Sequence, residues 1–148
     1  MQKLNTYDFG GKSMGTKKMI VMTESSKFKN NCVAGIDVNT GDWVRIVSDD
    51  ENIHGALTNE DITYEDGTMC QVMDVVSVPY ISNVPTASQP ENILIDRKYY
   101  IEKQGKATLG DVLAIHPDEM HNYLFGTRYS SVKEEYLEEL GVNYSLTL

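Results

Sequence analysis

Apolar and β-branched residues gather in short runs along the first two thirds of the chain, and turn-forming residues separate these runs. The run KKMIVMT (17–23) has the length of a buried strand. The runs NCVAGID (31–37) and DWVRIVS (42–48) flank a turn with Asn39 and Gly41, which tolerate the positive φ of tight hairpins. The pattern therefore predicts one strand followed by a β-hairpin.

Strand alternation sorts the side chains of the second hairpin strand into two sets. Trp43, Arg45 and Val47 fall on one face, and Val44 and Ile46 fall on the other. The only tryptophan of the chain is therefore predicted to lie beside a guanidinium on a single strand face.

The remaining pattern predicts further strands and then helices. Residues 49–67 are acidic and rich in turn formers, so we expect a long loop that can hold one short turn of helix. We predict a strand over 69–81, ended by Pro79, and another over 93–103. The elements expected after Gly105 are a helix or helical turn over 108–115 and over 117–124, a helix over 130–141, and a last strand at NYSLTL.

These elements favour a mainly β protein with late helices, of the α+β type, built on a small β-barrel. The strand–helix alternation of a parallel α/β sheet is missing from the pattern. Residues 1–16 are polar and glycine-rich, which predicts a tail or lead-in segment. Residues 82–92 have the composition of a linker or crossover and form the best candidate for an internal boundary.

Charge is distributed unevenly along the chain, whose formal net charge is -9. Residues 1–48 hold seven Lys/Arg and four Asp/Glu, whereas residues 49–148 hold six Lys/Arg and eighteen Asp/Glu. A long nucleic acid lying across the whole surface is therefore disfavoured, but a nucleotide or a short oligonucleotide near the first third is not.

Two sequence features bear on the compartment of the protein. No apolar run approaches the roughly 18 residues needed to span a bilayer, and the N-terminus lacks the apolar core of a signal peptide. We therefore expect a cytoplasmic protein without a membrane partner. In that compartment Cys32 and Cys70 are expected to be buried free thiols.

Short motifs for catalysis or metal binding are weak. GGKS (10–13) lacks the upstream strand and glycine of a phosphate-binding P-loop. His116 and His121 are five residues apart, which does not place both rings on one helical face, and the Ser26-x-x-Lys29 pattern has no companion motif. We therefore predict no catalytic residue, no metal site and no cofactor, and expect that the protein is not an enzyme.

The hairpin supplies the strongest candidate site. Trp43 offers a surface on which a base can stack, and Arg45 offers a planar cation that can clamp a phosphate. The residues expected to assist them in a polar, basic approach are Ser26, Lys27, Lys29 and Asn31. A second interpretation stays open, in which Trp43 is a core side chain and Arg45 pairs with a carboxylate such as Asp37 across the hairpin.

Several motifs together resemble a known family. In order they are Ser26-Lys27, Cys32-x-Ala34-Gly35, Gly41-x-Trp43-Val44-Arg45-x-Val47-Ser48, Asp74-Val75-Val76 and Gln89-Pro90-Glu91-Asn92. This order, from about residue 19 to about residue 96, resembles the prokaryotic dual OB-fold domain family. The resemblance implies two small five-stranded barrels packed together, which bind nucleic acid or nucleotides in prokaryotic conflict and mobile-element settings.

The resemblance also gives an expected domain organisation. The expected parts are a tail (1–16), a first OB-like barrel (17–81), a linker (82–92) and a second, reduced OB-like half with helices (93–148). The chain departs from the family pattern at Ile46, where the family usually has proline. It also ends where a second barrel would still need strands, so that barrel is either reduced or completed by a partner edge, as in a homodimer.

The sequence is compatible with three functions. The first is a non-catalytic module that binds a nucleotide or short single-stranded nucleic acid, with Asn92 of the Gln-Pro-Glu-Asn turn as a further contact. The second is an acidic protein-interaction module, such as a phage or mobile-element inhibitor of a basic host protein. The third is an enzyme acting on a nucleotide, which needs a carboxylate or histidine facing Trp43.

Overall fold

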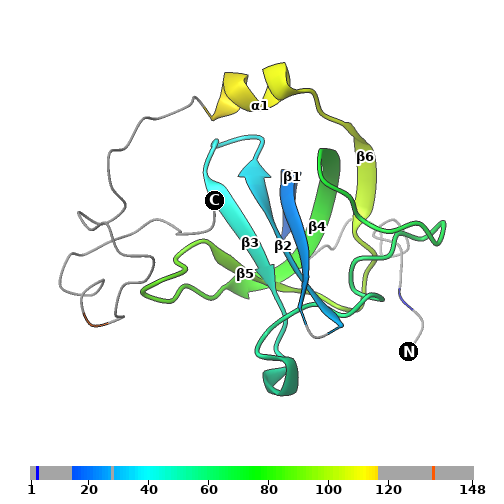
Figure 1. The fold of residues 1–148 in the computed structure, drawn as a ribbon, viewed down its shortest axis with the longest axis vertical. Coiled ribbons are helices and arrows are strands. Elements are labelled where there is room, and N and C mark those ends of the chain that lie inside the picture. Colours follow the sequence, from blue (N-terminus) through cyan, green and yellow to red (C-terminus); the bar gives the residue numbers. More distant parts are fainter. Residues whose placement is uncertain (1–2, 4–14, 28, 117–134, 136–148) are drawn as a thin grey trace.

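The computed structural model describes residues 3, 15–27, 29–116 and 135 (Figure 1). Most of the expected tail (1–16) lies outside the described residues. So do the predicted helical turn over 117–124, all but one residue of the helix predicted over 130–141, the predicted last strand and His121.

Six strands form one sheet, and five of them close into a barrel (Figure 1). The strands are β1 (Thr16–Lys27), β2 (Asn30–Asp37), β3 (Trp43–Val47), β4 (Asp74–Asn83), β5 (Asn92–Ile95) and β6 (Glu102–Lys106). The barrel order is β1-β2-β3-β5-β4, and pairing of β4 with β1 closes it. β3 and β5 run parallel, and β6 lies outside the barrel on the edge of β4. The predicted mainly β fold with a β-barrel is confirmed.

The elements before β4 agree with the sequence pattern. β1, β2 and β3 lie where strands were predicted, and β1 continues to Lys27. Its close approach to β2 depends on a glycine, because a Cβ at Gly35 would lie 1.9 Å from the carbonyl oxygen of Ile20. The acidic loop holds one short helix, η2 (Glu51–Ile53), as expected.

Two strand predictions were wrong in their bounds. β4 begins at Asp74 rather than at residue 69, and it passes through Pro79 to Asn83. Pro79 is tolerated because it forms the last pair of β4 with β1, and Tyr80 then begins the pairing with β5. The strand predicted over 93–103 is two strands, β5 and β6, separated by a turn after Asp96.

The helix predicted over 108–115 is confirmed as α1 (Leu109–Ile115). Its first turn is fixed by a capping box, in which Thr108 and Asp111 each accept a hydrogen bond from the backbone of the other. No helix among the described residues is both long and apolar enough to cross a membrane.

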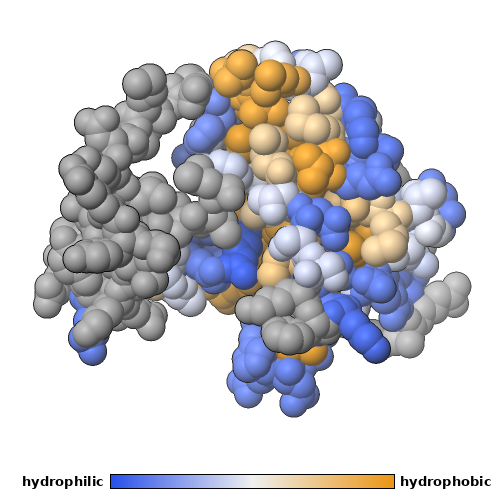
Figure 2. All heavy atoms as spheres, viewed as in Figure 1, coloured by the Kyte–Doolittle hydropathy of each residue, from blue (hydrophilic) through white to orange (hydrophobic). Residues whose placement is uncertain are grey.

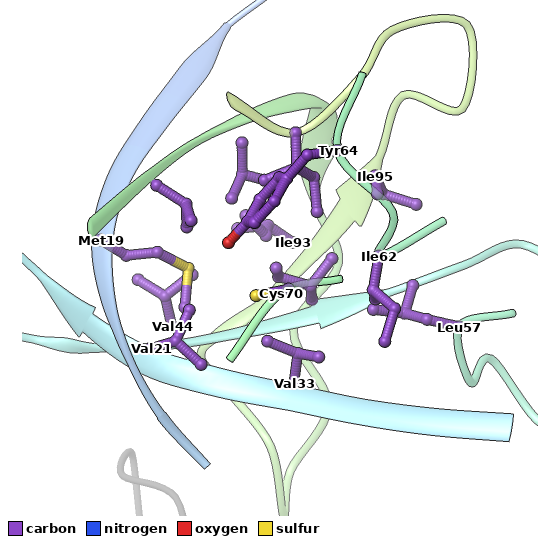
Figure 3. Close-up of a cluster of buried hydrophobic side chains, with 14 residues drawn as sticks. Met19, Val21, Val33, Val44, Leu57, Ile62, Tyr64, Cys70, Ile93 and Ile95 are labelled. Carbon is purple, nitrogen blue, oxygen red and sulfur yellow. The ribbon is translucent and has the colours of Figure 1, made fainter. Parts of the chain in front are cut away.

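The apolar side chains divide into an inner and an outer cluster. The inner cluster fills the barrel and includes Met19, Val33 and Ile93 (Figure 3). The outer cluster consists of Ile20, Ile36, Val112 and the partly buried side chains around them. Because Val112 belongs to α1, this helix packs on the outside of the β1–β2 hairpin, and apolar surface gathers at that end of the molecule (Figure 2).

The described part of the expected second half joins the same sheet as the first. Residues 82–92 comprise the end of β4, a loop and the first residue of β5. β5 pairs with both β3 and β4, and β6 pairs with β4. Residues 117–134 and 136–148 lie outside the description, so the division into two barrels stays a prediction.

Candidate nucleotide-binding site

β3 presents Trp43 and Arg45 on the outer face of the barrel. Val44 and Ile46 point inward and are 4% and 1% exposed, whereas Trp43 and Arg45 are half-buried. The alternation predicted from the sequence is therefore the one that the structure has, and it follows from filling the barrel with the two aliphatic side chains.

Trp43 is held from two sides. Its indole packs against the outer apolar cluster, and the ring of His116 meets it edge-on with 5.5 Å between the ring centroids and an interplanar angle of 69°. His116 follows α1 directly, and its Nδ1 lies 2.7 Å from the carbonyl oxygen of Gly41. Gly41 has a φ of 76°, and a Cβ there would lie 2.1 Å from the carbonyl oxygen of Ile115. The end of α1 is thus seated on the β2–β3 turn beside the indole.

A cavity of about 550 Å³ opens beside Trp43. Its walls come from the start of β1, the β2–β3 turn, β3, and the β4–β5 loop (84–91). The lining residues with polar or aromatic side chains include Lys17, Asp37, Asp42, Trp43, Glu91 and His116. Only part of the indole is therefore used in packing, and the rest faces this space.

The charge of the cavity wall is mainly negative. Lys17 is neutralised locally, because its Nζ lies 3.1 Å from Oδ2 of Asp37. Asp37 also accepts a hydrogen bond of 2.8 Å from the backbone N–H of Asn39 and so fixes the β2–β3 turn. Asp42 and Glu91 add two further carboxylates. The suggested pairing of Arg45 with Asp37 is not formed, because Asp37 binds Lys17.

Arg45 belongs to a polar cluster with few internal bonds. Its Nη2 makes one long contact of 3.9 Å with Sγ of Cys32, and its Nη1 is buried without a partner among the described residues. Its backbone N–H donates to the carbonyl oxygen of Glu91 at 3.1 Å, and Arg45 is in register with Asn92 on β5. We call Arg45, Glu91 and Asn92 the open polar cluster.

The acceptors of the open polar cluster are also without donors. Both carboxylate oxygens of Glu91 and Oδ1 of Asn92 are buried and have no hydrogen-bond partner in the described part of the chain. Asn92 is only 5% exposed, and its Nδ2 makes one long bond of 3.5 Å to Gln89. The cluster thus offers a buried donor and three buried acceptors to a ligand.

The structure separates several predicted site residues from this face. Asn31 is 3% exposed and points to the other side of β2, where its Nδ2 donates to Oδ1 of Asn59 at 2.8 Å. Ser26 is the register partner of Asn31 and therefore shares that side. Lys29 is exposed in the β1–β2 turn, and strand geometry places it about 20 Å from Trp43.

The predicted residues thus fall into two groups. Trp43, Arg45 and Asn92 come together, while Ser26, Lys29 and Asn31 lie toward the β1–β2 turn. Lys27 ends β1 in that turn, opposite Asn30. Sequence reasoning did not single out Glu91 as a site residue, although it lies inside the Gln-Pro-Glu-Asn motif. It also missed His116 as a neighbour of Trp43, and no local signal marks that contact.

A family model described as "Dual OB-containing domain" matches residues 17–148. The chain belongs to this dual OB-containing domain family. The match runs well past residue 96, where the recognisable motifs thin out. No curated protein and no solved structure matches the chain significantly.

Membership of the dual OB-containing domain family gives the candidate site a context. OB barrels bind ligands on the face of their second and third strands and at the loops that join strands 1–2 and 4–5. In this member those parts are β2, β3, the β1–β2 turn with Lys29, and the loop 84–91. Trp43 and the open polar cluster lie on this face, beside the second of these loops. Among the described residues no group of three His, Cys, Asp or Glu is placed to hold a metal ion.

Proposed function

We propose that the barrel is a non-catalytic module that binds a nucleotide or a short stretch of single-stranded nucleic acid. One observation carries the proposal. A half-buried indole forms part of the wall of a cavity of about 550 Å³ on the ligand-binding face of an OB barrel, and the neighbouring guanidinium has no ion pair among the described residues.

Base stacking would use Trp43. Stacking on an aromatic side chain contributes roughly 1–3 kcal/mol per base and accepts every base. His116 and the outer apolar cluster already hold the indole in place, so little side-chain freedom remains to be lost when a ligand binds.

Phosphate recognition would use Arg45. A guanidinium can donate two parallel hydrogen bonds to a phosphate, and Nη1 of Arg45 is unpartnered. The cavity itself carries Asp42 and Glu91, and its Lys17 is paired with Asp37. The acidic wall opposes several phosphates, so the base and sugar are expected in the cavity with one or two phosphates at its edge.

The test is titration calorimetry with nucleoside monophosphates, cyclic dinucleotides and short single-stranded oligonucleotides at low and high salt. We expect binding that weakens with salt by the amount of one or two phosphate contacts. Arg45→Met should weaken binding, whereas Lys98→Met, which removes an exposed cation from the β5–β6 turn, should not. The absence of heat with all three ligand classes would remove the proposal.

The non-catalytic part of the proposal has its own test. His116 and Glu91 are near Trp43 in the cavity wall, as an enzyme acting on a nucleotide would require. Nucleotides incubated with the protein, with and without Mg²⁺, should be recovered intact by chromatography. Formation of any product would show that the protein is an enzyme and not a non-catalytic binding module.

A second candidate is an acidic protein-interaction module that blocks a basic host protein. The observation in its favour is the loop 49–67, whose exposed acids include Asp49, Glu51, Glu60 and Asp66. The lobe that holds η2 is strongly hydrophilic on the surface (Figure 2). Recovery of one basic protein from a host lysate, lost at high salt, would support this function, and recovery of nothing specific would count against it.

Light scattering in the same buffers would test the proposed homodimer.

A further inference from the structure

We infer that the open polar cluster selects guanine as the base of the bound nucleotide. The inference rests on the proposed function and goes beyond it, because stacking on Trp43 does not distinguish bases. It is carried by three buried acceptors with no donor among the described residues, namely the two carboxylate oxygens of Glu91 and Oδ1 of Asn92.

Glu91 is half-buried as a residue, but both of its carboxylate oxygens are buried, and it differs from the buried acids of the described chain. Asp37, Asp61 and Asp74 each bind at least one cation. Asp96 also has an unpartnered oxygen, but its other oxygen accepts a bond of 3.1 Å from the N–H of Lys98. Both oxygens of Glu91 are buried without a partner. An unpartnered buried carboxylate is costly to the fold, so a donor that arrives with a ligand is the straightforward reason for its presence.

The residues of the open polar cluster are placed where they could form hydrogen bonds with the edge of a base stacked on Trp43. Glu91 and Trp43 line the same cavity, and the backbone of Glu91 is bonded to that of Arg45 at 3.1 Å. Arg45 is in register with Asn92 on the adjacent parallel strand. A base stacked on the indole would therefore have its edge close to the Glu91 carboxylate, with Asn92 beside it and Arg45 left for the phosphate.

Guanine is the base whose edge suits these acceptors. Its N1–H and 2-amino group are adjacent donors, which match the two oxygens of one carboxylate. Adenine and cytosine present an amino group next to a ring nitrogen that accepts, and this nitrogen would face a carboxylate oxygen. Uracil and thymine present one N–H between two carbonyl oxygens. Each of these four bases leaves at least one Glu91 oxygen unpaired.

An arginine side chain from a partner protein also has paired N–H donors. The mainly negative cavity wall would attract this cation as well, but a nucleotide also brings an anion to the Arg45 guanidinium, which has no ion pair among the described residues. The comparison of GMP with an arginine probe below therefore decides between the two ligands.

The experiment compares five nucleoside monophosphates by titration calorimetry with the full chain. GMP should bind about tenfold or more tightly than AMP, CMP and UMP, since a hydrogen bond to a charged group is worth at least that much. IMP differs from GMP only by the missing 2-amino group, and it should bind about tenfold more weakly than GMP. This pair needs no variant and is therefore independent of folding.

Two matched variants complete the test. Glu91→Gln keeps the shape of the side chain and replaces one acceptor by a donor, so it should abolish the preference for GMP over IMP. It should also strengthen AMP binding, because the amide matches the adjacent donor and acceptor of adenine. Glu51→Gln removes the same charge from the exposed helix η2 and should preserve the preference. Thermal melting of both variants verifies that they fold.

The outcomes separate this inference from the proposed function. Equal binding of all five nucleotides would overturn guanine selection and leave the binding module intact. Binding of none of them, or of any short oligonucleotide, would remove both. Preferential binding of the probe N-acetyl-arginine amide would also overturn guanine selection, in favour of a peptide ligand.

Discussion

Two buried polar clusters in one barrel have opposite hydrogen-bonding states. At Asp74, which is fully buried, Oδ2 accepts bonds from the Tyr64 hydroxyl at 2.6 Å and from the N–H of Gln71 at 3.0 Å. Its Oδ1 lies 2.9 Å from Nζ of Lys106 and 3.4 Å from Nζ of Lys103. In the open polar cluster, the carboxylate of Glu91 is buried with no such partner in the described chain.

The difference in bonding indicates which of the two clusters stabilises the folded state. Burial by itself would raise the pKa of Asp74, but the hydrogen bonds from Tyr64, Lys106 and Gln71 outweigh burial and hold this pKa below its ordinary value. The charged form is thus favoured in the folded state, and the cluster joins β4 and β6 to the loop before β4. The open polar cluster has no comparable set of hydrogen bonds among the described residues, which fits a place where a ligand completes the bonding.

The largest expected effect is that of Asp74→Ala. The substitution leaves the Tyr64 hydroxyl and the Gln71 N–H without their acceptor and removes the ion pairs with Lys103 and Lys106. We expect a loss of about 3–5 kcal/mol in the free energy of unfolding, measured by urea denaturation at pH 7. Asp66→Ala, in an exposed turn where the carboxylate accepts hydrogen bonds from Thr68, is the control and should cost far less than Asp74→Ala. Equal losses for both would contradict the role given to Asp74.

Much of the barrel follows from local sequence, whereas the site depends on long-range pairing. Alternation along β3 is enough to place Trp43 and Arg45 on one face, and the Asn-Thr-Gly turn is enough to define the hairpin. The capping of α1 at Thr108 is likewise a local signal. Asn92 reaches Arg45 only because β5 pairs in parallel with β3, which no local pattern specifies.

The same dependence on strand pairing explains where the structure departs from the local sequence pattern. Asn31 and Cys32 are neighbours on β2, yet only the pairing with β3 and the bridge to Leu57 decide which of them faces inward. Pro79 is a strand breaker in isolation, but in the barrel it falls where β4 changes its partner. The contact between Trp43 and His116 depends on where α1 packs, so it could not be read from the sequence near either residue.

Alkaline pH should weaken the polar cluster around Asp74, with the second largest effect. Burial raises the pKa of the Cys70 thiol from 9.0 to about 11, and burial together with the bond to Asp74 also raises the pKa of Tyr64. Because the folded state favours the protonated thiol, the contribution of Cys70 is complete below pH 9 and is lost as the pH rises toward 11. We expect the free energy of unfolding to fall by about 2–3 kcal/mol from Cys70 over this range. In urea titrations at pH 8 and pH 11, Cys70→Ala should show a correspondingly smaller fall, and an unchanged fall would exclude the thiol as its source.

A gain in stability is expected at the open polar cluster. Glu91→Gln replaces an unpartnered buried charge by a neutral group of the same shape, so the free energy of unfolding should rise by about 1–2 kcal/mol in the absence of ligand. Glu51→Gln, at an exposed position, should change it by less than about 0.5 kcal/mol. Thermal and urea denaturation without nucleotide provide the measurement. A clear loss of stability in Glu91→Gln would show that its carboxylate is bonded in the folded protein.

The smallest and most direct comparison removes one cation from each cluster. Lys106→Met should cost about 0.5–1 kcal/mol, because the half-exposed Lys106 ammonium lies 2.9 Å from Asp74 and Lys103 remains as a second partner. Arg45→Met should change the free energy of unfolding by less than about 0.5 kcal/mol, since its Nη1 has no partner among the described residues and the methionine retains the packing of the stem. Both variants remove one positive charge from a chain of net charge -9, so the general electrostatic effect cancels between them. A larger loss for Arg45→Met than for Lys106→Met would therefore mean that the guanidinium already stabilises the fold and is not held ready for an anion.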